Sequence, residues 1–214
     1  MIDDELYEKL VNSSSRGRYH ALTHKKMEAH LPACTYPSIL EVGGGSGQHV
    51  PYVTCGYTRY ECTDLKLPSN LHDSLDERVS FSVADVEKLE YLDSEFDRVV
   101  VTCLLHHLNR PLDALQEIRR VTKSDGVVTI LLSSDPGFTF RLVRRLVADR
   151  FLRKNGVSDV KLLRAMEHRN HASSLIAMIS HVFSKDVIHK KSFPLNGLSW
   201  NFTLFFVFQI EIKK

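Results

Sequence analysis

The spacing of apolar and polar positions changes character near residue 38 of the chain. Before that point, residues 3–11 and roughly 19–31 carry apolar side chains at helical spacing, and Pro32 and Pro37 then end the pattern. From residue 38 onward, short stretches suited to β-strands alternate with helical ones. The sequence therefore predicts an N-terminal helical cap followed by an α/β fold.

Five strands are expected before residue 134, in the stretches SILEV, TRYECT, VSFSVA, FDRVVVTCL and GVVTILLS. Between them we expect a helix near 47–55, a short segment near 68–76, and a helix near 111–121 that begins at Pro111. Strands joined by helical crossovers indicate a mostly parallel sheet with helices on both faces.

The last third of the chain follows a different order of elements. Residues 138–182 are expected to be helical and are rich in charges and histidines. The stretches DVIHKKSF and FTLFFVFQIEI then resemble two strands joined by a PLNGLSWN turn or loop. We expect these two strands to extend one edge of the parallel sheet.

Composition limits the classes of protein to which the chain could belong. With 214 residues, 43% of them hydrophobic, one domain is expected, and the 28 basic and 26 acidic residues give a net charge of only +2. This balance argues against nucleic acid as the main partner. The N-terminus lacks the pattern of a signal peptide, and the apolar run WNFTLFFVFQI is far shorter than the ~20 residues of a membrane-spanning helix. We therefore expect a cytoplasmic protein, with peripheral membrane contact left open.

The four cysteines have no CxxC spacing and no zinc-finger arrangement with histidines. They are Cys34, Cys55, Cys62 and Cys103. Free thiols in a reducing compartment are the expected state, and no metal site is predicted.

The stretch ILEVGGGSG places four glycines within five positions directly after the first expected strand. Gly43, Gly45 and Gly47 would allow backbone conformations and a close ligand approach that a Cβ atom would obstruct, and the amides of a following helix would face an anionic group. A dinucleotide-binding fingerprint would need glycine where Gln48 stands. The spacing here is GxGxG, preceded by Glu41.

The stretch EVGGGSG resembles the first motif of class I S-adenosylmethionine-dependent methyltransferases. YECTDL, VADVEKL and FDRVVVTCLLHHLNRPLDALQEIRRVTKSDGVVTI are similar to later motifs of the same family, in the same order. The resemblance covers residues 39 to about 133, nearly half of the chain. It implies a Rossmann-like, doubly wound α/β fold with a seven-stranded sheet, mostly parallel with an antiparallel C-terminal strand. It also implies S-adenosyl-L-methionine as cofactor and S-adenosyl-L-homocysteine as product.

Two aspartates at strand ends are candidates for contact with this cofactor. Asp64 lies about 20 residues beyond the glycine turn, where an acidic residue typically accepts hydrogen bonds from a ribose diol. Asp85 could accept from the adenine amine while the Val86 amide donates to a ring nitrogen, and the resemblance implies the same duties. A turn or helix-capping role is the structural alternative for both aspartates. Gly44, Leu65 and Cys103 complete the expected cofactor-binding set.

Glu41 has two interpretations. Its carboxylate could accept hydrogen bonds from amides of the glycine turn, or it could face the sulfonium end of the cofactor and help to balance its positive charge.

Two histidines after the fourth strand are the candidate catalytic residues. His107, with His106 second, could position the acceptor or remove a proton from it, because histidine titrates near neutral pH. The alternative is that the pair only shapes the pocket, since an LHH segment here occurs in family members with different substrates.

The stretch MEHRNH supplies candidate contacts to the acceptor: Glu167, His168, Arg169 and His171. A solvated helix face is the alternative, and metal binding is disfavoured because HxxH spacing lacks a third ligand. Tyr19 could reach the site from the N-terminal cap. The run RLVRRLVADRFLRK, residues 141–154, is either a basic surface for a phosphate-bearing acceptor or anionic membrane, or an ordinary amphipathic helix.

The predicted function is transfer of a methyl group from S-adenosylmethionine to an oxygen or nitrogen of a small-molecule or sugar-containing metabolite. We expect one domain divided into a helical cap (1–37), a cofactor-binding core (38–133), a helical substrate-side insertion (134–184) and a C-terminal strand pair (185–214). A transfer RNA methyltransferase and a non-catalytic, cofactor-binding regulator with the same fold are the alternatives.

Overall fold

The computed structural model describes residues 14–29, 31–33, 35–67 and 76–213. The helix expected at 3–11, Cys34 and nearly all of the short segment expected near 68–76 lie outside the described residues.

A single seven-stranded sheet forms the centre of the molecule, with the strand order β3-β2-β1-β4-β5-β7-β6. The five strands from β1 to β5 run parallel to one another, whereas β7 is antiparallel to both β5 and β6. The expected fold class, including the antiparallel C-terminal strand, is confirmed. The strands are β1 (Ser38–Val42), β2 (Arg59–Asp64), β3 (Val79–Val83), β4 (Phe96–Thr102), β5 (Thr122–Ser133), β6 (Val187–Phe193) and β7 (Phe205–Glu211).

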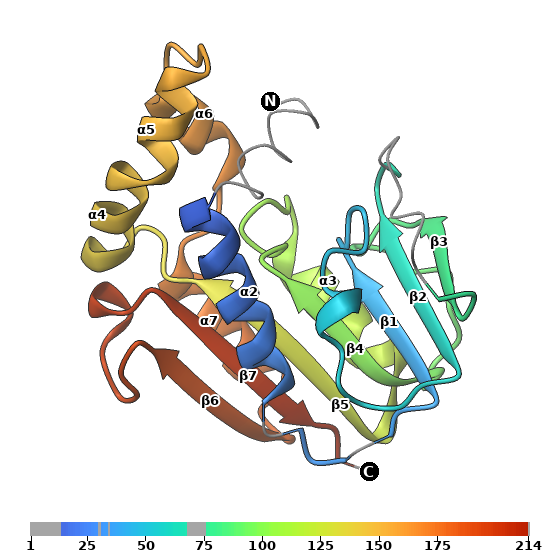
Figure 1. The fold of residues 1–214 in the computed structure, drawn as a ribbon. Coiled ribbons are helices and arrows are strands. Elements are labelled where there is room, and N and C mark those ends of the chain that lie inside the picture. Colours follow the sequence, from blue (N-terminus) through green and yellow to red (C-terminus); the bar gives the residue numbers. More distant parts are fainter. Residues whose placement is uncertain (1–13, 30, 34, 68–75, 214) are drawn as a thin grey trace.

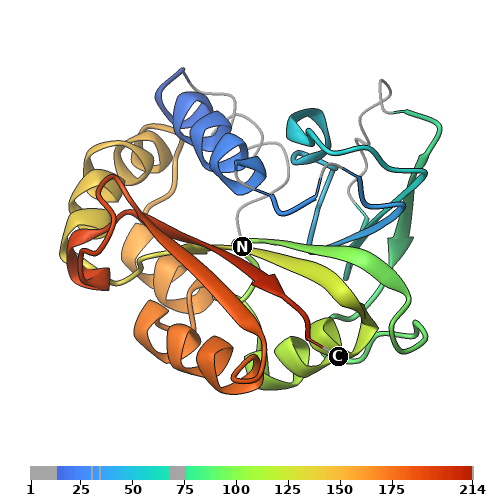
Figure 2. The same ribbon diagram turned by 90° about the horizontal axis from the view of Figure 1, so that it is seen from below.

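Helices cover both faces of the sheet and extend beyond one of its ends. One face is crossed by α2, and α3 and α7 cover the other (Figures 1 and 2). Three short helices, α4, α5 and α6, form a separate layer beyond the end of β5 (Figure 1). The bounds are α2 (Ser14–Glu28), α3 (Pro111–Val121), α4 (Phe138–Leu146), α5 (Ala148–Lys154), α6 (Val160–Glu167) and α7 (Ala172–Val182), with 3-10 helices η1 (Val50–Tyr52) and η2 (Trp200–Phe202).

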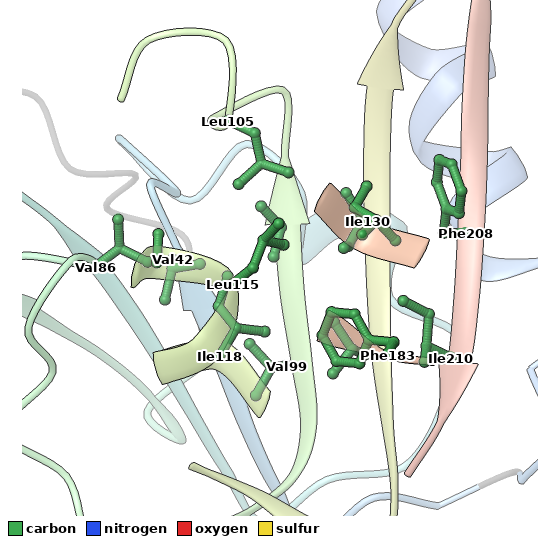
Figure 3. Packing of buried hydrophobic residues seen from close by; sticks show 14 of the residues in the cluster. Val42, Val86, Val99, Leu105, Leu115, Ile118, Ile130, Phe183, Phe208 and Ile210 are labelled. Atoms are coloured by element: carbon green, nitrogen blue, oxygen red, sulfur yellow. The ribbon is translucent and has the colours of Figure 1, made fainter. Parts of the chain in front are cut away.

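The two faces of the sheet contribute to two separate apolar clusters. On the face of α3 and α7, Leu115 and Ile118 pack towards the strands, and Phe183 lies beside Ile130 of β5 and Ile210 of β7 (Figure 3). Each of these five side chains is completely buried. This cluster fixes the strands whose carboxyl ends carry the candidate site.

A buried ion pair holds α2 to the other face. Arg98, in the middle of β4, donates to both carboxylate oxygens of Glu28, with nitrogen-to-oxygen distances of 2.6 and 3.2 Å. The side chains are 0% and 2% exposed. His49 also bonds Glu28, at 3.0 Å. The last residue of α2 is therefore tied to the centre of the sheet by a charge pair that has no access to water.

The prediction of a helix near 47–55 is wrong. The chain turns at Gly47, whose φ is +78°, and only Val50–Tyr52 form a single 3-10 turn before Val53 becomes extended. The hydrogen bonds here join residues three apart, such as Val50 N to the Gly47 carbonyl. Backbone amides of a turn, and not the N-terminus of a helix, therefore follow the glycine stretch.

The basic run 141–154 is also not one continuous helix. It is divided between α4 and α5 at Val147, which adopts φ −107° and ψ −73°. The arginines of the run therefore lie on two separate helices, α4 and α5.

Candidate functional site

The glycine turn after β1 lies at the carboxyl end of the parallel strands. Gly43, Gly45 and Gly47 all have positive φ values, of 67°, 54° and 78°. Such values favour glycine because they bring a Cβ atom close to the backbone. The unusual density of glycine in this stretch is thus a requirement of its backbone geometry.

The neighbouring glycines serve different purposes. A Cβ added to Gly44 would lie 2.3 Å from the Cys62 sulfur, and one added to Gly43 would lie 2.7 Å from Leu104, so these two glycines let the turn pack onto β2 and the end of β4. A Cβ added to Gly45 would have no atom within 4 Å. Gly45 therefore presents bare backbone to open space, where a ligand could approach closely.

Asp64 closes this space at the end of β2. Its carboxylate accepts from the Gly45 amide at 3.1 Å and from the Leu65 amide at 2.7 Å. Each carboxylate oxygen has further acceptor capacity for a hydroxyl donor. The Leu65 side chain, 65% exposed, lies beside it. The structure thus brings together the turn and the first of the two predicted carboxylates.

The second predicted carboxylate lies at the end of the next strand. Asp85 follows β3, and its side chain accepts from the Glu87 amide at 2.9 Å. Asp85 is exposed, and the neighbouring Val86 is buried against the core. The amide of Ala84 bonds the Asp64 carbonyl at 3.0 Å, so the two strand ends are in register. Both aspartates therefore lie on the same edge of the sheet as the glycine turn.

Glu41 lies buried beneath the turn. Its carboxylate accepts from the Tyr60 hydroxyl at 2.7 Å and from the Thr102 hydroxyl at 3.2 Å. The residue is only 1% exposed, and burial raises the pKa of the Glu41 carboxyl. A Cβ on Gly44 would come within 2.9 Å of the Glu41 carboxyl carbon. Glu41 therefore supports the turn from below, bonded to side chains of β2 and β4.

Cys103 begins the segment that leads from β4 to the histidine pair. It has a positive φ of 54°, and its amide bonds the Leu131 carbonyl of β5 at 3.1 Å. A left-handed conformation is uncommon for a side-chain-bearing residue and redirects the chain sharply. The turn at Cys103 points the following residues over the carboxyl edge of the sheet.

Both ring nitrogens of His106 lie within hydrogen-bond distance of other groups of the protein. One ring nitrogen lies 2.7 Å from the Asn170 carbonyl, and the other lies 3.0 Å from the Ser133 carbonyl and 2.8 Å from the Ser133 hydroxyl. The side chain is buried, and burial lowers the pKa of His106 to about 4. This geometry suits a residue that joins β5 to the segment before α7.

His107 faces the surface beside His168. The two rings meet edge to face, with centroids 5.0 Å apart, while His168 also stacks on His106 at 5.2 Å. Burial of its ring, followed by the nearby His168, lowers the pKa of His107 to about 4, although the residue still reaches solvent. His107 is thus the more accessible of the predicted pair and is neutral near pH 7.

Residues 168–171 link α6, which ends at Glu167, to α7, so the alternative of a solvated helix face does not hold for them. Glu167 ends α6 and lies 3.3 Å from Arg164, and His171 directly precedes α7. Arg169 contacts the Asn109 side chain, and its amide donates to the His106 carbonyl at 2.9 Å. The link is therefore fixed onto the loop that carries the histidine pair.

Tyr19 lies on α2 and packs against the start of β7. Its ring meets Phe205 edge to face at 5.8 Å, and Phe205 pairs with Ser133 at the carboxyl end of β5. The structure therefore places Tyr19 over the same edge of the sheet, but within an apolar cluster and next to β7.

Sequence reasoning missed Asp135, which connects the histidines to the basic helices. Its carboxylate lies 2.6 Å from the His168 ring and 2.5 Å from the Arg144 guanidinium. Burial acts to raise the pKa of Asp135, but His168 and Arg144 together lower it to about 2. Its position in the sequence could have identified it, because it lies two residues after the end of β5, at the carboxyl edge of the sheet.

The arrangement fits a nucleoside with a cationic substituent. Bare backbone at Gly45 offers close approach, Asp64 and Asp85 offer acceptors to hydroxyl and amine donors, and Glu41 supplies a buried carboxyl beneath. Within the described ranges, no three His, Cys, Asp or Glu side chains converge as ligands for a metal. No helix of the described residues is both long and apolar enough to cross a membrane.

Comparison with known proteins agrees with this geometry. Residues 40–130 match the methyltransferase domain family. A ubiquinone/menaquinone biosynthesis C-methyltransferase UbiE from Coxiella burnetii is 36% identical over 78 residues, which are 32% of this chain and 31% of that protein. Its counterpart from Bdellovibrio bacteriovorus is 28% identical over 134 residues, covering 58% of this chain and 56% of that protein. The matched stretches thus span about a third to a half of these curated relatives.

A solved structure extends the likeness to the whole fold. A chain from the complex between the Haloferax volcanii Trm112 methyltransferase activator and a methyltransferase aligns with a TM-score of 0.68 at 15% identity. The alignment covers 100% of this chain and 98% of that chain. The match of residues 40–130 to the methyltransferase domain family and the shared fold support a class I S-adenosylmethionine-dependent methyltransferase, so the resemblance inferred from the sequence is confirmed. The family implies S-adenosylmethionine as its cofactor.

Proposed function

We propose that this chain transfers the methyl group of S-adenosylmethionine to an oxygen or nitrogen atom of a small, polar or sugar-containing metabolite. The observation that carries the proposal is the open backbone at Gly45 beside the Asp64 carboxylate. When bound, the cofactor would supply an electrophilic methyl carbon on a sulfonium. The protein would contribute mainly alignment of the acceptor with that carbon.

We assign the cofactor contacts to the edge formed by β1, β2 and β3. Asp64 would accept from the ribose hydroxyls, Asp85 from the adenine amine, and the Val86 amide would donate to the adenine ring. Gly43, Gly44, Gly47, Leu65 and Cys103 would shape the wall of this site. Glu41 would act from below as a buried carboxyl that favours the positively charged end of the ligand.

The two histidines are proposed to have different roles. His107 would lie near the acceptor, and because its pKa is lowered to about 4 it would be neutral near pH 7, with an unprotonated ring nitrogen that could position the acceptor by a hydrogen bond or act as a weak base. His106 would be a positioning residue, since both of its ring nitrogens are already engaged by Asn170 and Ser133.

The acceptor is proposed to meet residues 134–184, the substrate-side insertion of the single domain. The curated relatives carry names that point to quinone C-methylation. In this chain, the side chains gathered beyond β5 are charged, among them Asp135, Arg144 and His168. A charged surface favours a polar acceptor over a quinone ring, which would prefer apolar walls. Glu167, Arg169 and His171 would border the same region, with Tyr19 on its α2 side.

The test measures binding first and turnover second. Calorimetric titration should show that the chain binds S-adenosylmethionine and S-adenosylhomocysteine, and Glu41→Gln should weaken the former more than the latter, since only the former carries the sulfonium charge. An acceptor panel should include sugar nucleotides, amines and demethylated quinones, with release of S-adenosylhomocysteine as the readout. A chain that bound neither cofactor form would overturn the proposal. Turnover confined to quinones would overturn the assignment of the acceptor.

A further inference from the structure

A cavity of about 280 Å³ lies between α4, α5, α6 and the link before α7. Its lining contains no residue of the glycine turn, but it includes Asp135, which follows β5. Six basic residues line it, and we call it the arginine cavity. They are Arg141, Arg144, Arg145, Arg153, Lys161 and Arg164.

The charge of this lining is strongly unbalanced. The acidic residues in the lining are Asp135 and Asp149, so the cavity has a formal excess of four positive charges before its histidines are counted. A solvated helix face would spread such charges over the surface, whereas here the basic side chains of three helices, α4, α5 and α6, line one cavity. Positive charge concentrated in a concave site attracts a polyanion.

The basic residues occupy two levels of the cavity. Arg144 and Arg164 form the inner level, with side chains 16% and 12% exposed, and each pairs with a carboxylate of the protein. The Arg144 Nε atom is buried and has no hydrogen-bond partner among the described residues. A ligand oxygen would satisfy this donor, whose burial is otherwise costly.

The outer level consists of cations that have no ion pair among the described residues. Arg141, Arg145, Arg153 and Lys161 are exposed at the rim, and none forms an ion pair within the part of the chain that the structure describes. Guanidinium groups match the oxygens of phosphate in a bidentate geometry. A single carboxylate would offset only a small part of this charge, so a phosphate or diphosphate group fits the lining better.

The arginine cavity adjoins the histidine pair. His168 and Asn170 contribute to its lining. The same His168 ring contacts His106 and His107, and Asn170 bonds the carbonyls of Leu105 and Leu108. An anion held here would bring whatever it is attached to beside the carboxyl end of β4.

We infer that the arginine cavity binds the phosphate or diphosphate group of the methyl acceptor. The identification of the ligand as the acceptor rests on the proposed function, whereas the anion site rests on the cavity alone. Two sources of such a group are chemically equivalent here, a soluble phosphorylated metabolite and a phospholipid or lipid-linked headgroup. The lipid source is relevant because Phe138, Leu142 and Leu146 leave an apolar stripe of α4 exposed by 54%, 48% and 65%.

The first experiment titrates pyrophosphate into the full chain by calorimetry at low ionic strength. We expect saturable binding that the double variant Arg145→Gln/Arg153→Gln weakens by about tenfold or more. Arg150→Gln is the matched control, because Arg150 is an exposed arginine of α5 outside the cavity lining, and it should change the affinity less than about twofold. Titration of S-adenosylmethionine into the same variants should be unaffected.

The second experiment separates the two sources of phosphate. It measures cosedimentation with phosphatidylglycerol vesicles, compared with phosphatidylcholine vesicles. If the phosphate belongs to a lipid, the wild type should sediment with the phosphatidylglycerol vesicles and the variant Leu142→Ser/Leu146→Ser should not. If it belongs to a soluble metabolite, the wild type should not sediment with them either. Pyrophosphate binding by this variant should persist in either case. Absence of pyrophosphate binding, or equal affinities in the cavity variant and its control, would overturn the inference. Pyrophosphate binding through the cavity without S-adenosylmethionine binding would remove the proposed function and leave the anion site standing.

Discussion

Replacing Arg98 by methionine would remove a fully buried cation from the centre of the sheet. The two hydrogen bonds to Glu28 would be lost, together with those to the Thr129 hydroxyl at 3.3 Å and the Cys55 sulfur at 3.4 Å. Glu28 would then be left 2% exposed, with His49 and the amide and hydroxyl of Thr54 as its remaining hydrogen-bond donors. Breaking a buried pair by removing one partner costs about 3–5 kcal/mol. At about 2–4 °C per kcal/mol for a chain of this size, the melting temperature should fall by roughly 6–20 °C.

The assay is a double-mutant cycle by urea unfolding. Glu28→Leu alone should be similarly destabilising, since it leaves Arg98 buried without a counterion. The double variant should lose less than the sum of the single changes by about 2 kcal/mol or more, because no uncompensated charge remains. Single effects below about 1 kcal/mol, or effects that simply add within about 0.5 kcal/mol, would refute the reasoning.

Three further predictions concern the site, the packing of the glycine turn and the loss of folding stability at acid pH. Asp64→Asn should weaken S-adenosylmethionine binding by about tenfold or more in calorimetry, while the exposed control Asp93→Asn should not, and equal effects would contradict the role of Asp64. Gly44→Ala should cost about 1–3 kcal/mol in urea unfolding, and Cys62→Ala should recover part of that loss, because the added Cβ would meet the Cys62 sulfur. His24 on α2 is only 1% exposed, and burial of its ring lowers its pKa to about 2, so below pH 6.5 the unfolded chain takes up a proton at His24 that the folded chain does not bind. Stability should therefore fall with falling pH, and His24→Gln should reduce the slope by up to about 1.4 kcal/mol per pH unit, a change whose absence would contradict the burial argument.

The strand pattern was readable from the sequence because each strand has a distinctive composition. The predicted stretch SILEV coincides with β1, and the helix expected near 111–121 coincides with α3. The carboxyl ends of parallel strands share one edge of a sheet, so Asp64 could be placed beside the glycine turn without coordinates. These predictions succeeded because they depend on local pattern and on the geometry of parallel sheets.

Other features depend on contacts between distant segments and left no local signal. Arg98 lies beside the apolar run of three valines in β4, and its partner Glu28 is 70 positions away. The helix expected after the glycine turn failed because Gly47 takes a left-handed conformation and His49 turns inward to bond Glu28. The arginine cavity likewise exists only because the basic run breaks at Val147 and folds against α6.

The central claim is that the glycine turn and the two strand-end aspartates hold S-adenosylmethionine. A crystal structure of the chain with S-adenosylhomocysteine tests it most directly. We expect the ribose hydroxyls within hydrogen-bond distance of Asp64, the adenine beside Asp85 and Val86, and the amino-acid portion against Gly45. Ligand density elsewhere on the molecule, or density at the turn with neither aspartate in contact with it, would contradict the account.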